Sequence, residues 1–248
     1  MLRAKFFFLV FSLFSFSLLA QQEGRLETDR PDQTECPFIV KKGYIQMEWG
    51  FNRQVESGVL SWTYPTSLMK IGLGKRWEAR YTSVWGREEG QSTYQSDAVG
   101  FKYALLFPEK SFARVSLIAH YRINDQKRDE SERNNQRHSV GDFVFTVQHD
   151  FAKGFGLGYN VGAEMHSNGT AECIYRFAPN MNIGKRGYAY VEVFGRVPSS
   201  SQTDQWVDGG LAYYISDDLK LDISAGKSLQ SEQTWYVALG LSFRFKVF

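Results

Sequence analysis

The last strand-length segment of the chain alternates strictly between two kinds of residue. Between Trp235 and Phe245 the sequence reads WYVALGLSFRF, and every second position, including Leu239, is apolar. The positions between them hold Tyr236 and then small, polar or charged residues. Because neighbouring side chains of a strand point to opposite faces, the segment predicts one apolar and one polar face. A strand of this length is typical of a transmembrane β-barrel, which faces lipid outside and water inside.

The N-terminus has the pattern of an export signal. Arg3 and Lys5 precede an apolar run over residues 6–19 and the small residue Ala20, so we expect a Sec signal peptide over residues 1–20. An uncleaved helix is the alternative, although the run is short for a membrane span. No cysteine sits at the expected cleavage point between Ala20 and Gln21, which argues against a lipoprotein anchor. The expected location is the outer membrane of a Gram-negative bacterium.

Twelve strand-like segments follow a polar lead over residues 21–42, which we expect to form an N-terminal periplasmic segment. We expect residues 43–248 to form an all-β domain, a membrane-spanning antiparallel up-and-down β-barrel of about twelve strands. Pro65 and Pro179 fall inside two expected strands, and each predicts a bulge, an edge or a wrong boundary, because proline cannot donate to the ladder. The expected strands cover residues 44–53, 59–73, 77–86, 98–107, 112–123, 140–151, 155–165, 171–183, 188–197, 206–215, 219–227 and 233–247.

The links between these segments differ in length on the two sides of the expected sheet. Short turns face the periplasm in outer-membrane barrels, so we expect both termini on that side. A soluble β-sandwich, the alternative fold, needs no such asymmetry. The charged link over 124–139 is solvated surface, a contact to the outer leaflet or a constriction, and the sequence leaves all three open. The short links are 74–76, 108–110, 152–154, 184–187 and 216–218, and the long ones are 87–97, 124–139 and 198–205.

Composition excludes several classes of function. Loss of Arg3 and Lys5 with the signal takes the formal charge from +2 to 0, which argues against nucleic acid as a partner. We expect no cofactor and no metal site, because the four histidines show no ligand spacing. Cys36 and Cys173 could pair in an oxidising compartment, but the expected topology places them near opposite membrane faces and disfavours a disulfide.

Strand parity predicts which charged side chains face the lumen. A twelve-stranded barrel lies between barrels filled by their own side chains and open porins. The inward charges therefore either pair with one another or form a ladder that guides polar solutes. Their mixed sign favours neither anions nor cations. The candidates are Glu48, Lys70, Glu78, Arg80, Lys102, Arg114, His120, Arg122, Glu164, Arg176, Glu192, Arg196, Asp208, Asp222 and Arg244.

Four charged residues, Asp29, Arg30, Asp32 and Glu35, lie in the polar lead before the first strand. In one interpretation, the two aspartates fix turns around Pro31 through bonds from side chain to backbone. In the other, the lead folds into the periplasmic mouth and pairs with luminal charges as a latch. A metal site is disfavoured because no histidine accompanies these acids.

Residues 165–169, Met-His-Ser-Asn-Gly, resemble part of the motif of outer-membrane phospholipase A, which is also a twelve-stranded barrel. That family places its histidine and serine two positions apart, on the same side of a strand. Here His166 and Ser167 are adjacent and would point to opposite faces, whereas a base and nucleophile need to lie about 3 Å apart. Asn168-Gly169 is in itself a hairpin signal. We therefore expect no enzyme.

The segment over residues 26–51 resembles the opening of an outer-membrane family named for the meta-pathway of phenol degradation, also described as outer-membrane transporters. The resembling elements are Thr28-Asp29-Arg30-Pro31-Asp32, Thr34-Glu35 and Gly43-Tyr44 leading to Glu48. Gly100-Phe101-Lys102-Tyr103 resembles a strand of the same family. The resemblance implies a β-barrel that moves small molecules, with aromatic or other small organic compounds as its solutes.

Together these features predict an outer-membrane channel for the passive passage of small solutes. Its other expected partners are the lipid of the outer membrane and the barrel assembly machinery. A sealed barrel used for envelope architecture or adhesion is the first alternative. An outer-membrane lipid hydrolase is the second.

Overall fold

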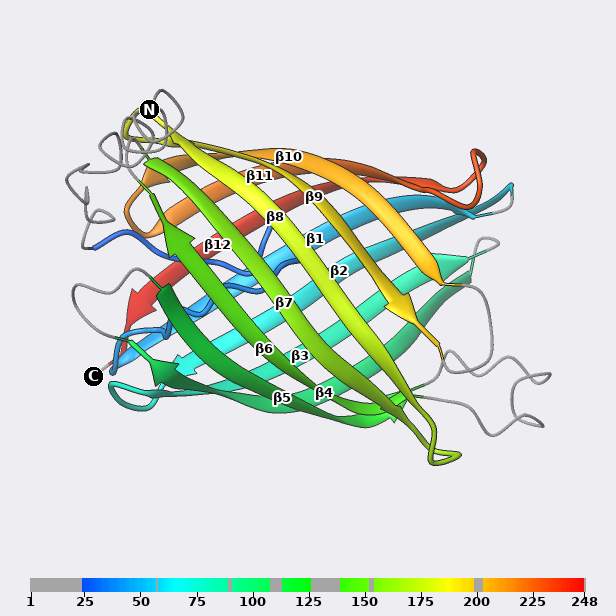
Figure 1. The fold of residues 1–248 in the computed structure, drawn as a ribbon, viewed down its shortest axis with the longest axis horizontal. Coiled ribbons are helices and arrows are strands. Elements are labelled where there is room, and N and C mark those ends of the chain that lie inside the picture. Colours follow the sequence, from blue (N-terminus) through cyan, green and yellow to red (C-terminus); the bar gives the residue numbers. More distant parts are fainter. Residues whose placement is uncertain are drawn as a thin grey trace, which may run out of the picture.

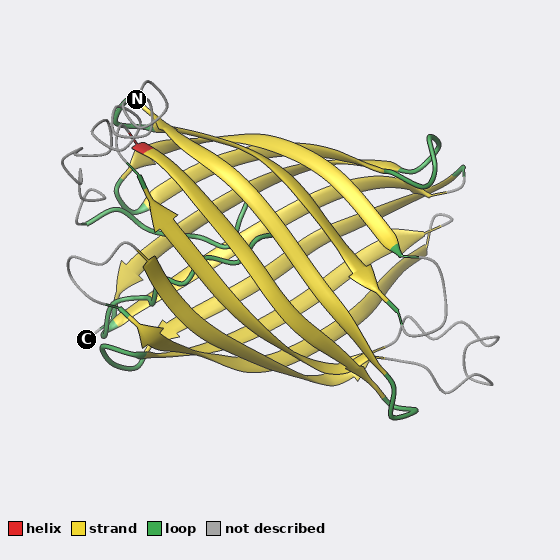
Figure 2. Ribbon diagram, in the orientation of Figure 1, coloured by secondary structure: helices red, strands yellow, loops and turns green. Residues whose placement is uncertain are grey.

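The computed structural model describes residues 24–56, 58–88, 91–107, 113–125, 139–151, 154–198 and 203–247. Twelve antiparallel strands form a closed barrel in which each strand pairs with its neighbours in the chain and β1 pairs with β12 (Figures 1 and 2). The predicted fold class and strand number are confirmed. The strands are β1 (Tyr44–Glu56), β2 (Val59–Gly72), β3 (Trp77–Glu88), β4 (Gln91–Leu106), β5 (Ala113–Asp125), β6 (Ser139–Asp150), β7 (Phe155–His166), β8 (Ala171–Ile183), β9 (Gly187–Val197), β10 (Asp204–Ser216), β11 (Leu219–Ser228) and β12 (Trp235–Lys246).

The strand boundaries differ most from prediction between β3 and β4. The long link expected over 87–97 is wrong, because β3 runs to Glu88 and β4 begins at Gln91. The backbones of the two strands pair as far as Glu88 with Gln91. Ladder hydrogen bonds join backbone groups and need no apolar side chains, so a polar segment can extend a hairpin. The predicted links over 124–139 and 198–205 fall largely outside the described residues, as does the expected signal peptide.

The two predicted proline disruptions have different outcomes. At Pro65 the register between β2 and β3 shifts between Thr63 and Thr66, which is the predicted bulge. Pro179 pairs with Leu157 of β7 inside a continuous β8, but the pairing of β8 with β9 omits Ala178 and Pro179 without a shift of register, so the proline interrupts the ladder on one side and causes no bulge.

Both ends of the described chain lie at the same end of the barrel as the turns from β2 to β3, from β8 to β9 and from β10 to β11 (Figure 1). The backbone N–H of Leu26 donates to the carbonyl of Asp217 in the turn between β10 and β11. The N–H of Val247 donates to the carbonyl of Gly43. We call this the short-turn end, and it is the end that we predict to face the periplasm.

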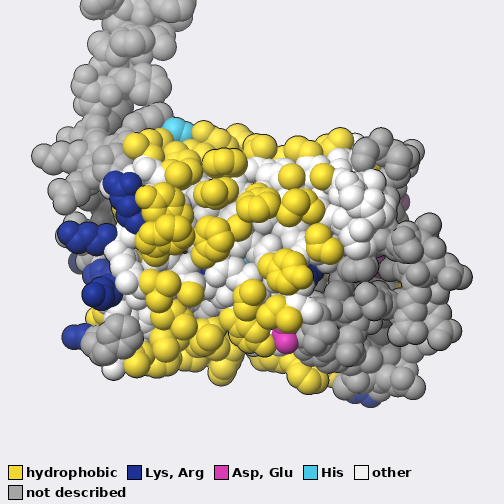
Figure 3. All heavy atoms as spheres, turned by 90° about the horizontal axis from the view of Figure 1, so that it is seen from below, with side chains coloured by type: hydrophobic (Ala, Val, Ile, Leu, Met, Phe, Trp, Pro, Cys, Tyr) yellow, Lys and Arg dark blue, Asp and Glu magenta, His cyan; other side chains and the backbone are white. Residues whose placement is uncertain are grey.

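The outer surface is an apolar belt (Figure 3). Phe145, Val161 and Leu239 are 50%, 54% and 54% exposed, although a soluble protein would bury such side chains. Lys and Arg side chains gather at the left end of the belt in the view of Figure 3. A continuous apolar surface of this kind fits contact with lipid. Among the described residues there is no helix with the length and apolarity that a membrane span requires.

The interior of the barrel is polar. Lys70, Lys102 and Lys220 are among the largest fully buried side chains. A small apolar cluster of Ile118, Val144 and Ile174 interrupts this polar lining. Charges buried this deeply require partners, and the N-terminal segment supplies many of them.

Candidate functional site

Residues 24–43 form a loop inside the barrel, which we call the luminal loop. It is the blue segment that runs between the strands in Figure 1. It enters at the short-turn end, where the Arg244 side chain donates to the carbonyl of Gly24. It returns to the same end at Gly43, just before β1. The lead was expected at the periplasmic mouth, but its described part extends into the lumen, because buried partners for its charges lie on the inner faces of the strands.

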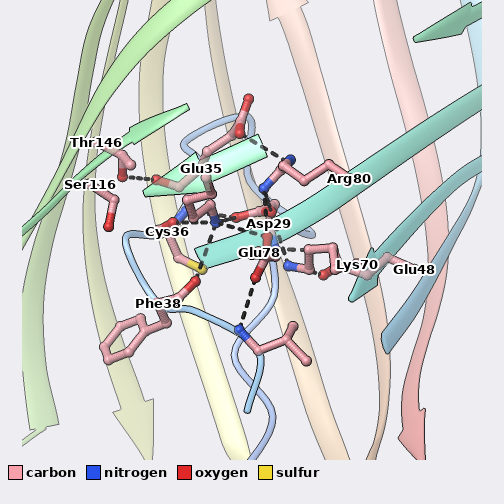
Figure 4. A network of polar contacts seen from close by, with 12 residues as sticks. Asp29, Glu35, Cys36, Phe38, Glu48, Lys70, Glu78, Arg80, Ser116 and Thr146 are labelled. Atoms are coloured by element: carbon pink, nitrogen blue, oxygen red, sulfur yellow. Dashed lines mark hydrogen bonds and ion pairs between the residues drawn. The ribbon is translucent and has the colours of Figure 1, made fainter. Parts of the chain in front are cut away.

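Asp29 is held by three cationic side chains from three successive strands. Its carboxylate accepts from Lys70 of β2 at 3.0 Å, from Arg80 of β3 at 3.0 Å and from Lys102 of β4 at 3.3 Å (Figure 4). Burial alone would raise the pKa of Asp29, but Lys102, Lys70 and Arg80 hold it well below its usual range. Asp29 is therefore an anion at neutral pH and the central charge of this group.

The carboxylates of Glu48 and Glu78 complete this group. We call its six residues, Asp29, Glu48, Lys70, Glu78, Arg80 and Lys102, the Asp29 cluster. Glu48 of β1 pairs with Lys70 and also accepts the backbone N–H of Asp29 at 3.0 Å. Glu78 pairs with Arg80 at 3.3 Å and accepts the N–H of Val40, on the returning arm of the loop, at 2.9 Å. The cluster therefore binds both arms of the luminal loop to the wall formed by β1–β4.

The deepest part of the loop, near Glu35, is bound to the opposite wall. The Glu35 carboxylate pairs with Arg80 at 3.1 Å and with Arg176 of β8 at 3.3 Å. Its backbone N–H donates to the Asn160 side chain of β7 at 2.8 Å. The N–H of Gln33 donates to Glu192 of β9 at 2.7 Å, and the neighbouring Thr34 hydroxyl binds the same carboxylate.

Arg30 lies in a slot that two glycines provide. Gly50 of β1 and Gly240 of β12 are directly paired, and a Cβ atom on either would lie 2.4–2.5 Å from the Arg30 guanidinium. Within the slot, Arg30 pairs with Asp222 of β11 at 3.1 Å and donates to the carbonyl of Leu239 at 3.2 Å. The inward-facing Gly240 of the alternating terminal segment thus makes room for a charge from the loop.

Most of the remaining candidates form ion pairs away from the Asp29 cluster, whereas His120 also accepts a hydrogen bond from Arg80 of the cluster at 3.0 Å. Glu164 pairs with Arg122 at 3.5 Å and with Arg196 at 3.2 Å. The Arg196 side chain is 51% exposed, so its ion pair with Glu164 is only partly enclosed. Three more pairs are His120 with Asp142 at 2.9 Å, Arg114 with Asp150, and Arg244 with Asp218.

Glu192 and Asp208 differ from the other candidates because they face each other across β9 and β10. Glu192 is bound by the loop, as described above. Asp208 is bound by the hydroxyls of Tyr190 and Tyr236. The structure thus brings most of the candidates into pairs with one another or with the loop, which was the first of the two interpretations of the inward charges.

The candidate list omitted luminal residues that also bind the loop. Lys220 is 1% exposed and donates to Thr28 and to the carbonyl of Arg30. The Tyr190 hydroxyl donates to the carbonyl of Pro31 at 3.2 Å. Parity places both side chains inward, but the list was restricted to charges and missed the tyrosines. Lys220 lies two positions before Asp222 on β11, so the same alternation predicts that its side chain faces the lumen.

Burial and a neighbouring carboxylate favour the neutral form of Asp32. Its carboxyl accepts a hydrogen bond from the Tyr188 hydroxyl at 3.3 Å, which favours the anion but does not outweigh them. Burial, followed by the nearby charge of Glu192, raises the pKa of Asp32 to about 8. The loop therefore carries one acid, Asp29, held as an anion and another, Asp32, that is mostly protonated at neutral pH.

The two cysteines are both free. Cys36 lies in the luminal loop, where its backbone carbonyl accepts from Lys102 at 2.7 Å. Cys173 is exposed on β8. Burial raises the pKa of the Cys36 thiol far above its usual range, so this half-buried thiol is a poor nucleophile while the loop is in place.

Residues 165–169 span the end of β7 and the turn between β7 and β8. Gly169 has a φ of +81°, and the Asn168 side chain accepts from the backbone N–H of Thr170 at 3.1 Å. The hairpin predicted from Asn168-Gly169 is confirmed. His166 ends β7, with its Nε2 3.6 Å from Glu172, and Ser167 follows it in the turn. Among the described residues, no group of three or more His, Cys, Asp or Glu is arranged to hold a metal ion.

Comparison with solved structures places the fold among outer-membrane barrels. The COG4313 outer membrane channel from Pseudomonas putida F1 superposes with a TM-score of 0.63 at 8% identity, over 88% of this chain and 100% of that one. The KdgM porin in complex with disordered oligogalacturonate gives 0.60 at 8% identity, over 81% and 99%. The NanC porin gives 0.54 at 12% identity, over 80% and 98%. At these identities the likeness concerns the fold alone.

No curated protein matches the sequence significantly. The model of the family described as "Putative MetA-pathway of phenol degradation" matches residues 28–245. The match begins in the luminal loop and ends in β12, so it includes the loop together with the barrel. The chain therefore belongs to this family, and its fold is that of the outer-membrane β-barrels.

Proposed function

We propose that this barrel is a passive channel for small solutes and that the luminal loop closes it in the conformation described above. The observation that carries the proposal is that the loop has a polar or cation–π contact with every strand. The contacting residues, from β1 to β12, are Glu48, Lys70, Arg80, Lys102, Ser116, Thr146, Asn160, Arg176, Glu192, Tyr214, Lys220 and Arg244.

The comparisons support a channel for small solutes. The similar structures include an outer membrane channel and two porins, one of them with bound oligogalacturonate. The family description refers to phenol degradation, which supports aromatic or other small organic compounds as solutes. In this proposal a solute enters between the long links, reaches the charged lumen and passes when the loop moves aside. The protein acts as a conduit and not as an enzyme.

Paired luminal charges also favour a second candidate, a permanently sealed barrel. Buried ion pairs such as Asp29 with Lys70 would keep the lumen filled if the loop never left it. The two candidates differ in one respect, which is whether the loop can be released while the barrel stays folded.

The topology and partners of the proposal follow from the same features. The short-turn end faces the periplasm, and residues 1–20 direct export. The apolar belt contacts lipid of the outer membrane. The alternating segment of β12 is the one that the barrel assembly machinery would recognise.

Conductance in planar bilayers tests the proposal. We compare the full chain with a variant lacking residues 21–42 and with Glu35→Gln, which removes the ion pairs with Arg80 and Arg176 but keeps the loop. If the loop can be released, conductance steps should be larger or more frequent in both variants than in the full chain. Silence in all three proteins, with folding confirmed by heat-modifiable gel mobility, would overturn the channel in favour of the sealed barrel.

A further inference from the structure

A cavity of about 390 Å³ lies beside the luminal loop, which fills only part of the lumen. It is lined by both arms of the loop and by the wall that runs from β6 to β11, from Gly184 at the short-turn end to Asp32 and Thr34 in the deep part of the loop. We call this cavity the vestibule. Its volume is in the range of small-molecule binding pockets.

The position of the vestibule follows from the way the loop is attached. The Asp29 cluster draws the loop toward β1–β4. On the opposite wall, the vestibule is lined by Gly154, Gly156 and Gly184, which have no side chains to fill the space. The loop is bound more tightly to the charged wall of β1–β4 and faces a wall with glycines. The vestibule therefore lies to one side of the lumen.

Most of the charged side chains that line the vestibule are already bound within the protein. Three basic and three acidic residues line it, and one of the acids, Asp32, is mostly protonated at neutral pH. Arg25 donates to Asn182 at 2.8 Å and lies 3.7 Å from the centre of the Tyr214 ring. Asp150 is paired with Arg114. An ionic solute would have to displace such contacts, whereas a neutral solute would not, so the electrostatics favour a neutral ligand.

The uncharged groups of the lining indicate the chemistry of that ligand. Gln148, Asn180 and Asn182 carry amides, which both donate and accept hydrogen bonds. Phe38 adds an aromatic ring that can pack against the C–H face of a ligand. A purely apolar molecule would offer these amides no further hydrogen bonds. A molecule with several hydroxyl groups would satisfy them.

We propose that the vestibule binds a neutral, polyhydroxylated small molecule of about the size of a monosaccharide. This inference rests on the proposed function, because the vestibule would be the last binding site that a solute occupies before it leaves at the short-turn end. It adds a chemical class that the family description does not contain.

Saturation-transfer NMR on the detergent-extracted full-length protein tests this site. The probes are methyl glucoside, which is neutral, gluconate, which is anionic, glucosamine, which is cationic, and toluene, which is apolar. Methyl glucoside is expected to bind at least threefold more tightly than the other three. Equal or tighter binding of any of them would overturn the proposed ligand class.

Two substitutions place the bound probe in the vestibule. Asn180→Leu removes an amide and keeps its volume, and roughly threefold to tenfold weaker binding of methyl glucoside is expected. Gly156→Met fills the space. A Cβ there would meet only the movable side-chain ends of Asn180 and Gln148, at 2.5 and 2.6 Å, so the barrel should tolerate it. The control is Asn168→Leu in the distant turn between β7 and β8, which should leave binding unchanged.

Unchanged affinity in both Asn180→Leu and Gly156→Met would overturn the site. Conductance measured on the same samples separates this inference from the proposed function. Conductance steps in a protein that does not bind the probe would overturn this inference and leave the proposed channel function intact. Probe binding at the vestibule without steps would support the site and count against the channel.

Discussion

Asp29→Asn removes the central charge of the luminal loop while keeping the shape of the side chain. In the native protein the Asp29 carboxylate binds Lys70, Arg80 and Lys102 at 3.0–3.3 Å. All four residues are buried. The substitution leaves three buried cations with only the two glutamates of the Asp29 cluster and Glu35 to balance them. We expect the loop to be released more often from an otherwise intact barrel.

The size of the effect follows from the burial of these charges. Removing one partner of a buried ion pair destabilises by about 3–5 kcal/mol, because the remaining charge is left uncompensated. If all of this free energy is lost from the docking of the luminal loop, the fraction of molecules with a released loop rises roughly a hundredfold to several thousandfold, since about 1.4 kcal/mol corresponds to a factor of ten. Glu48 and Glu78 remain as partners, which favours the lower part of that range.

Cys36 is a native reporter of this release. It lies inside the loop, and burial raises the pKa of its thiol, so a water-soluble maleimide should react slowly while the loop is docked. Cys173 is replaced by serine, which leaves Cys36 as the only cysteine. The labelling rate, followed by mass spectrometry, is expected to increase in Asp29→Asn by the factor given above. Glu56→Gln, at the exposed end of β1, is the control and should not alter it.

A labelling rate within threefold of the parent protein, in an Asp29→Asn barrel that keeps its heat-modifiable mobility, would refute this reasoning. It would mean that the Asp29 cluster does not determine whether the loop stays in the lumen. Labelling that is fast already in the parent protein would refute it as well, because the loop would then be free without any substitution.

Two further predictions concern the slot and the protonation of the loop. Gly240→Ala places a Cβ 2.5 Å from Nε of Arg30, and overpacking of this kind costs about 1–3 kcal/mol, so Cys36 labelling should accelerate. Gly74→Ala, with open space around its Cβ, should leave the rate unchanged. Burial and Glu192 raise the pKa of Asp32 to about 8. Docking of the loop therefore takes up a proton at Asp32 and weakens as pH rises toward 8. The open probability of the channel in bilayers should therefore increase between pH 6 and 9. A flat pH profile, or a profile like that of Asp32→Asn, would contradict this.

The alternation of residue types was sufficient to predict the number of strands and which face of each strand points into the lumen. Tyr236 and Gly240 face inward and Leu239 outward, as the alternation of the terminal segment predicts, because this period is a local property of extended backbone. The predicted hairpin at Asn168-Gly169 is local in the same sense. The extension of β4 back to Gln91 was missed, because polar composition does not prevent backbone pairing.

The tertiary structure alone decided where the polar lead goes and what it binds. Arg30 meets Asp222, 192 positions away, in a slot between two glycines that become neighbours only when β1 pairs with β12. Parity placed Lys70 and Lys102 inside the barrel, but it could not show that Asp29 joins them. Those contacts require the barrel to close around the loop, and closure brings together residues whose spacing in the sequence carries no periodic signal.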